Sequence, residues 1–175
     1  MKNLISITLF CLILLSGCQC KKQQTSVQQV QPKLMAEEKK IPAFKMNDIN
    51  GKEVDIMSEI AKNKITIIDF WASWCRPCIQ EAPNVVSIYN DLHSKGLGII
   101  GISLDEDDNS WKKAVSKLNM NWTQLSNLKG GGSHAAQFFQ INAIPHIVIV
   151  NDKGGILAEG LRGDELRSFV EQHLQ

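Results

Sequence analysis

The sequence has almost no net charge and no apolar run long enough to cross a membrane. Its 175 residues carry 19 Lys and Arg against 18 Asp and Glu, a formal charge of +1. This balance provides no basic field, so we expect no nucleic-acid partner. The longest apolar stretch, Leu4 to Leu15, is shorter than the ~20 residues that a membrane-spanning helix needs. The length and the 43% apolar content predict one domain with a full core.

Cysteine is scarce in the part of the chain that is expected to fold. Cys11, Cys18 and Cys20 stand near the N-terminus, which leaves only Cys75 and Cys78 in the rest. An odd total with this distribution does not predict a disulfide scaffold. The sequence therefore directs attention to the chemistry of one isolated pair.

Residues 1–17 predict a signal peptide, since Lys2 precedes a short apolar run. The segment Leu15-Ser16-Gly17-Cys18 resembles the bacterial lipobox, which implies cleavage before Cys18 and acylation of its sulfur and its new amino group. Two or three acyl chains give stable anchoring. An ordinary signal peptide that happens to carry a cysteine is the alternative.

Residues 18–40 are rich in Gln and Lys and poor in apolar side chains. They predict a flexible tether between the lipid and a folded domain, residues 41–175. Sorting rules for bacterial lipoproteins favour the outer membrane, because Gln19 rather than Asp follows Cys18. We therefore expect a lipid-anchored protein of the bacterial envelope that faces the periplasm.

The remaining chain alternates between strand and helix patterns and ends in a hairpin and a helix. The expected elements are a β-hairpin over 41–54 with Asn50-Gly51 as its two-residue turn, strand 65–70, helix 75–94 with Pro83 inside it, strand 97–104, helix 111–118 capped by 108–110, an extended segment 122–125, helix 133–140, strands 147–150 and 156–160, and helix 163–174. The alternation predicts an α/β fold with a mixed sheet. Gly130-Gly131-Gly132 matches no nucleotide-binding motif and predicts a flexible loop, so no cofactor beyond the cysteine pair is expected.

The cysteine pair follows a buried strand and opens a helix. Two thiols at i and i+3 on a first helical turn lie close enough for a disulfide. The helix N-terminus favours the thiolate, so Cys75 is the expected nucleophile, exposed at the helix start, and Cys78 the resolving thiol. A static disulfide and a zinc site are the alternatives. Zinc needs about four ligands and the histidines show no paired ligand spacing, so we expect no metal.

Five features in register resemble the thioredoxin fold, and more narrowly the TlpA/ResA-like thiol–disulfide oxidoreductases, over roughly residues 41–175. They are Trp74-Cys75-Arg76-Pro77-Cys78, Asp69 at the end of the preceding strand, Glu81, the helix-interior Pro83, and Ile144-Pro145 before a strand. The resemblance implies a thioredoxin-fold sheet flanked by helices, with an added N-terminal hairpin. Two positions depart from the family, since Arg76 stands where thioredoxin has Gly and His146 where Thr is commoner.

The resemblance also implies roles for these residues. Asp69 would accept or relay the proton of Cys78, unless it is a solvated carboxylate at the strand end. Glu81 would assist it or contact the partner, or is a surface residue without function. Pro145 would have a cis peptide bond and present Ile144 for strand-like pairing, or is an ordinary trans turn proline. Trp74, Arg76 and Pro77 would border the substrate, with Trp71 in the core.

The sequence therefore predicts an envelope-anchored thiol–disulfide oxidoreductase, most consistent with a reductase of protein disulfides. Its implied partners are protein disulfide substrates, among them apocytochrome c, and a transmembrane thiol–disulfide electron donor. A copper-binding chaperone on the same fold is one alternative, although it would use a wider cysteine spacing and a distant histidine. A peroxiredoxin-like thiol peroxidase is another, although Ala72 stands where that chemistry usually has Thr.

Overall fold

The two central strands are buried along their whole length, as their continuous apolar sequences predict. They are β3 (Ile65–Trp71) and β4 (Leu97–Ser103), which pair in parallel. On its other side β3 pairs with β6 (His146–Asn151) in the antiparallel direction. The sheet is therefore mixed, and the cysteine pair follows the carboxyl end of β3.

The computed structural model describes residues 39–175. The predicted signal peptide, Cys18 and nearly all of the predicted tether lie outside the described residues. Within the described part of the chain, no helix is long and apolar enough to cross a membrane. The segment just before the first strand is hydrogen-bonded to the rest of the domain, because Ile41 donates its N–H to the carbonyl oxygen of Gly154 at 3.0 Å.

Seven strands form one sheet in the order β2-β1-β5-β4-β3-β6-β7. The outer strands are β1 (Lys45–Asp48), β2 (Glu53–Asp55), β5 (Thr123–Ser126) and β7 (Ile156–Glu159). The predicted N-terminal hairpin is confirmed, and it extends the sheet because β1 pairs antiparallel with β5. That long-range pairing has no signal in the local sequence.

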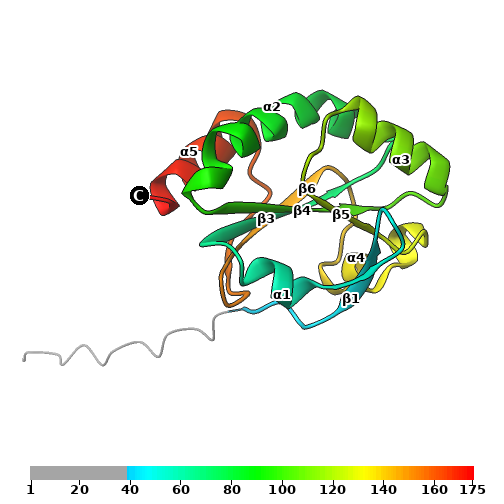
Figure 1. Ribbon diagram of the computed structural model, residues 1–175, viewed down its shortest axis with the longest axis horizontal. Coiled ribbons are helices and arrows are strands. Elements are labelled where there is room, and N and C mark those ends of the chain that lie inside the picture. The colour runs from blue at the N-terminus through cyan, green and yellow to red at the C-terminus, as the bar shows by residue number, and fades with distance from the viewer. Residues whose placement is uncertain (1–38) are drawn as a thin grey trace, which may run out of the picture. The chain divides into compact units, whose positions relative to one another are not determined.

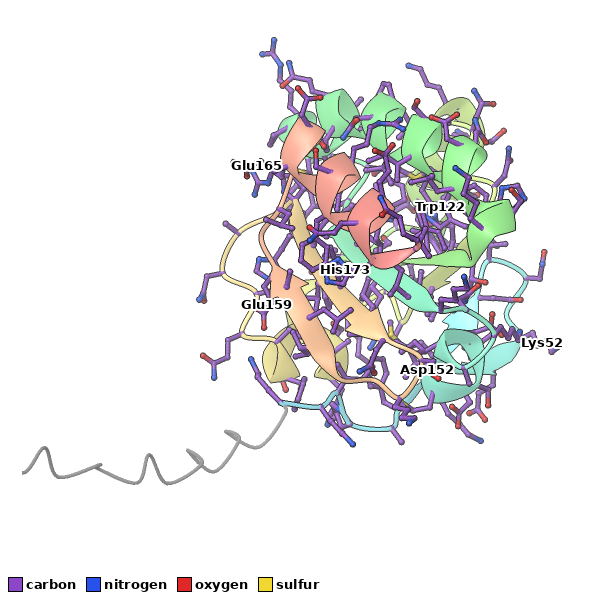
Figure 2. The ribbon with its side chains drawn as sticks, turned by 90° about the vertical axis from the view of Figure 1, so that its left-hand side faces the viewer. Lys52, Trp122, Asp152, Glu159, Glu165 and His173 are labelled. Atoms are coloured by element: carbon purple, nitrogen blue, oxygen red, sulfur yellow. A yellow bond between two sulfur atoms is a disulfide. The ribbon has the colours of Figure 1, made fainter. Side chains whose placement is uncertain are left out.

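Helices cover both faces of the sheet (Figure 1). They are α1 (Ile56–Ile60), α2 (Arg76–Leu92), α3 (Asp108–Lys117), α4 (His134–Phe138) and α5 (Gly163–His173), with 3₁₀ turns over His93–Lys95 and Gly130–Gly132. One face carries α2, α3 and α5, and the other carries α1 and α4. Figure 2 shows α5 lying over the strands, with Glu165 near its beginning and His173 near its end. This arrangement is the thioredoxin fold that the sequence predicts.

Three local predictions are wrong in detail. The hairpin loop has three residues rather than two, because Asp48 still pairs with Lys52 and Gly51 takes the left-handed φ of 80° that such a loop needs. Helix α3 begins three residues early, at Asp108, because Asp107 is its cap and accepts the N–H of Ser110 at 2.8 Å. The three glycines, predicted as a flexible loop, form a 3₁₀ turn.

Helix α1 is missing from the sequence prediction, although its signal is present. Asp55 caps it by accepting the N–H of Ser58 at 3.0 Å, and Ile56 and Ile60 are both fully buried at a spacing of four residues. Five residues are too few for the periodicity to stand out.

Candidate active site

The cysteine pair is held at the start of α2. Cys75 is the N-cap of that helix, and its Sγ accepts the N–H of Cys78 at 3.2 Å. A disulfide joins the two residues, whose Cα atoms are 5.3 Å apart. Pro77 stands in the first turn, where its missing N–H costs nothing because that donor has no helical partner anyway. The predicted pair at i and i+3 is therefore confirmed in its bonded form.

The two cysteines are less accessible than predicted. Cys75 is only 4% exposed, as is Cys78, so the prediction of an exposed nucleophile is wrong for the disulfide form. The loop before β6 covers Cys75, since the carbonyl oxygen of Ile144 lies 3.6 Å from its Sγ. Trp74, by contrast, is 66% exposed and projects from the surface beside the pair. Trp74 is therefore the accessible side chain of this segment, and Cys75 is accessible only within a cleft.

That cleft has a volume of about 890 Å³. Its walls come from segments that are far apart in the sequence: Ser73 to Pro77, Leu104 to Asp107 with Ser110, Gly130 and Gly131, and Ile141 to Ile144. Trp74, Arg76 and Pro77, which are predicted to contact the substrate, border it, and Ile144 does so from the opposite loop. Trp71 is in the core instead, where its Nε1 donates to Gln124 at 3.1 Å.

The loop opposite the disulfide contains the predicted cis peptide bond, between Ile144 and Pro145. Pro145 itself is buried. Its carbonyl oxygen accepts a hydrogen bond from Nη2 of Arg162, a residue at the start of α5. Arg162 therefore fixes the loop, which lies against the Cys75 sulfur on its other side.

Asp69 lies on β3 and is 6% exposed. Burial, and after it the negative charge of Glu81, raise the pKa of Asp69 from its ordinary 3.8 to about 7, and the positive charge of Arg162 opposes the rise. The alternative of a solvated carboxylate is thereby wrong. A carboxyl group of this kind takes up and releases a proton near neutral pH, which suits a proton acceptor.

Glu81 is half-buried on α2, one turn beyond Cys78. Its Oε1 accepts the N–H of Gly163 at 2.9 Å and the amide of Asn84 at 2.8 Å. Glu81 therefore joins α2 to the beginning of α5, besides acting electrostatically on Asp69. It is not a free surface carboxylate.

A buried carboxylate holds the turn that leads to Cys75. Asp105, 1% exposed, accepts the N–H of Ser73 at 2.9 Å and its hydroxyl at 2.6 Å. It also accepts the hydroxyl of Ser103 at 2.8 Å. Asp105 thereby fixes the turn between β3 and α2 to the end of β4.

Sequence reasoning missed the roles of Asp105 and Arg162. Asp105 could have been found, because it follows β4 at the same edge of the sheet where β3 delivers the cysteines. Arg162 could not have been found, because it contacts Pro145, 17 residues earlier in the sequence. That contact depends on how β6, β7 and α5 fold back on one another.

The described part of the chain, residues 39–175, contains no cluster of three or more His, Cys, Asp or Glu side chains placed to hold a metal ion. The acidic run that starts at Asp105 instead serves the fold, through the contacts of Asp105 and the cap at Asp107. His146 is half-buried and lies 3.6 Å from a carboxylate oxygen of Glu159, on the strand next to its own.

Comparison with known proteins places this geometry in a family. The model of the AhpC/TSA family matches residues 38–159. The thiol-disulfide oxidoreductase ResA of Bacillus thuringiensis subsp. konkukian is 26% identical over 137 residues, which cover 78% of this chain and 76% of ResA. The thiol:disulfide interchange protein HelX of Rhodobacter capsulatus is 24% identical over 119 residues, covering 68% of this chain and 64% of HelX.

Solved structures agree with these relatives. The thioredoxin domain of a thiol-disulfide oxidoreductase from Bacteroides vulgatus is 32% identical, with a TM-score of 0.72 over 81% of this chain and 99% of that domain. A thiol-disulfide oxidoreductase from Bacteroides fragilis is 27% identical, with a TM-score of 0.72 over 77% of this chain and 98% of the other. This chain therefore belongs to the thioredoxin-like AhpC/TSA family and is a thiol–disulfide oxidoreductase of the ResA type, with Cys75 and Cys78 as its cysteine pair.

Proposed function

We propose that this protein is a lipid-anchored reductase of protein disulfides in the bacterial envelope. The observation that supports it best is the Cys75–Cys78 disulfide at a helix N-terminus, on the wall of an open cleft and opposite the Ile144 carbonyl. An extended chain laid in this cleft would pair with the backbone at Ile144 while its disulfide meets Cys75. The exposed indole of Trp74 would cover its other side.

The reaction begins with the reduced pair. The Cys75 thiolate attacks one sulfur of the substrate disulfide, whose S–S bond breaks, and the released substrate thiolate takes a proton from water. Cys78 then gives its proton to Asp69 and attacks the sulfur of Cys75. The mixed disulfide breaks, the second substrate thiolate leaves and is protonated, and Cys75–Cys78 is oxidised. Two electrons have passed to the substrate.

The charges around the pair support the reducing direction. Strong oxidants of this fold stabilise their thiolate form. Here the helix N-terminus stabilises the thiolate of Cys75, but Glu81 lies one turn beyond Cys78 and Asp69 lies in the same charge cluster. The negative charge of Glu81 opposes stabilisation of the thiolate, so the dithiol form is less stabilised than in such oxidants and gives up electrons more readily.

The predicted anchor and partners complete the proposal. Lipidated Cys18 would hold the domain at the periplasmic face of a membrane, with the outer membrane favoured by Gln19. Reduction outside the cytoplasm needs electrons carried across the membrane, so a transmembrane thiol–disulfide donor would reduce Cys75–Cys78 after each cycle. Apocytochrome c cysteines and wrongly oxidised envelope proteins are the proposed substrates.

A thiol peroxidase is the second candidate, because the matching model is that of the AhpC/TSA family. Ala72 is fully buried three residues before Cys75 and offers no hydroxyl to bind a peroxide oxygen. The bonded partner of Cys75 is the near neighbour Cys78. Both features favour disulfide exchange. The copper-chaperone alternative gains no support from residues 39–175.

Reduction of insulin disulfides by the full chain, with dithiothreitol as the electron source, tests the proposal. Cys75→Ser should abolish turnover, and Cys78→Ser should accumulate a mixed disulfide with the substrate. Cys20→Ser is the matched control and should leave turnover unchanged. Unchanged insulin reduction by Cys75→Ser would falsify the mechanism, and rapid hydrogen peroxide consumption or stoichiometric Cu(I) binding would favour one of the two alternatives.

A further inference from the structure

Two adjacent residues at the start of α5 contact both halves of the active site. Arg162 is the N-cap of α5, with an extended backbone, and its guanidinium donates to the carbonyl oxygen of Pro145. The next residue, Gly163, donates its N–H to Glu81 on α2 at 2.9 Å. The turn between β7 and α5 therefore ties the cysteine helix to the loop that carries the cis-proline.

Arg162 also acts on the buried carboxyl of this region. The charged groups that act on Asp69 are Glu81 from α2 and Arg162 from the β7–α5 turn. The residues beside Asp69 on the neighbouring strands, Gly101 and Ile147, carry no charge. Arg162 is thus the positive charge of this cluster. Arg162 is exposed as a residue, whereas Asp69 is buried.

We propose that Arg162 is a positioning residue for both steps of disulfide exchange: it holds the Ile144–Pro145 segment against Cys75, and with Gly163 it holds the start of α5 against Glu81 on the helix that carries Cys78. The inference rests on the proposed function, because it assigns Arg162 a part in the same two steps. In the first step a fixed loop presents the Ile144 backbone to an extended substrate. In the second, the Cys78 proton moves to the Asp69 carboxylate, the Cys78 thiolate attacks the Cys75 sulfur, and the substrate thiolate leaves and is protonated by water.

Substitutions of Arg162 separate its hydrogen bond to Pro145 from the effect of its charge on Asp69. Arg162→Gln removes the charge and weakens the hold on Pro145. Asp69 then ionises at a higher pH, so a smaller share of it accepts a proton at neutral pH. Arg162→Lys keeps the charge but loses the planar donor group, so it restores the electrostatic contribution alone. Arg167→Gln is the matched control, since Arg167 lies on the same helix and binds Asp91 and Ser87 instead.

The experiment uses the full chain in micelles of a nonionic detergent. The carboxyl ¹³C resonance of Asp69 is titrated by NMR in the oxidised protein, which reports its ionisation without any turnover. The pH midpoint for release of the mixed disulfide and the KM for a peptide disulfide are measured on the same variants. Circular dichroism establishes that each variant is folded.

In Arg162→Gln we expect the Asp69 midpoint and the release midpoint to move together to higher pH. We expect KM to rise roughly tenfold, as for loss of one charge-assisted hydrogen bond. Arg162→Lys should return both midpoints towards the wild-type values, and Arg167→Gln should change nothing. An unshifted Asp69 midpoint, the same shift in both Arg162 variants, or an unchanged KM in Arg162→Gln overturns the assignment. A shifted Asp69 midpoint with a fixed release midpoint instead contradicts the acceptor role of Asp69, and so the second step of the proposed function.

Discussion

The buried carboxyl of Asp69 makes a quantitative prediction about stability. Its pKa is about 7 in the folded protein, against an ordinary 3.8. Between these two values the unfolded chain loses the proton while the folded protein keeps it. Folding stability therefore falls as pH rises from about 4 to about 7, and this contribution is constant above pH 7. Asp69→Asn removes it, because the amide does not titrate.

The magnitude follows from the pH interval. Each pH unit within this window changes the free energy of unfolding by about 1.36 kcal/mol. From pH 5 to pH 7 that amounts to about 3 kcal/mol, with nothing added up to pH 8. The stability of Asp69→Asn relative to wild type should therefore increase by about 3 kcal/mol between pH 5 and pH 8. Any fixed cost of burying the amide cancels in this comparison.

Urea unfolding of residues 39–175, which belong to one compact unit, measures this difference. The protein is kept oxidised, so that neither Cys75 nor Cys78 titrates. Asp152→Asn, at an exposed turn, is the control, and its difference from wild type should stay within about 0.5 kcal/mol at both pH values. A difference for Asp69→Asn that does not change between pH 5 and pH 8 refutes the argument.

Three further substitutions test the site. Asp105→Asn should destabilise the fold by about 1–3 kcal/mol in urea unfolding, because its three hydrogen bonds to Ser73 and Ser103 weaken, and no loss would contradict its anchoring role. Trp74→Ala should change stability by less than about 0.5 kcal/mol but raise KM for a protein disulfide, since the side chain is 66% exposed; an unchanged KM argues against docking there. Gly130→Ala should cost about 1–2 kcal/mol, because Gly130 has a left-handed φ of 53° that an Ala side chain disfavours; a neutral or stabilising result contradicts the strain.

The sequence predicts those parts of the site that depend on neighbouring residues. The Trp74 to Cys78 segment follows a continuous apolar strand and opens a helix, and both features are local. The cis peptide before Pro145 followed from a family motif, and it is confirmed. These signals suffice because a strand, a turn and a helix start are each set within a few residues.

What the sequence does not predict depends on contacts between distant segments. The burial of Cys75 depends on Ile144, 69 residues away in the sequence. The contact of Arg162 with Pro145 depends on how the chain runs through β6 and β7 between them. Glu81 reaches Gly163 across 82 residues. No local sequence pattern encodes such long-range contacts. The role of a residue such as Arg162 can therefore be identified only once the order of the strands and the placement of the helices are known.

The direction of electron flow is the central claim, and the reduction potential of the Cys75–Cys78 pair tests it most directly. Equilibration of the protein with a thiol–disulfide buffer of known potential gives this value. We expect a potential near that of thioredoxin, about −270 mV, as for a protein that donates electrons to disulfides. A potential near about −120 mV, as in strong periplasmic oxidants, would mean that the pair inserts disulfides and would contradict the account.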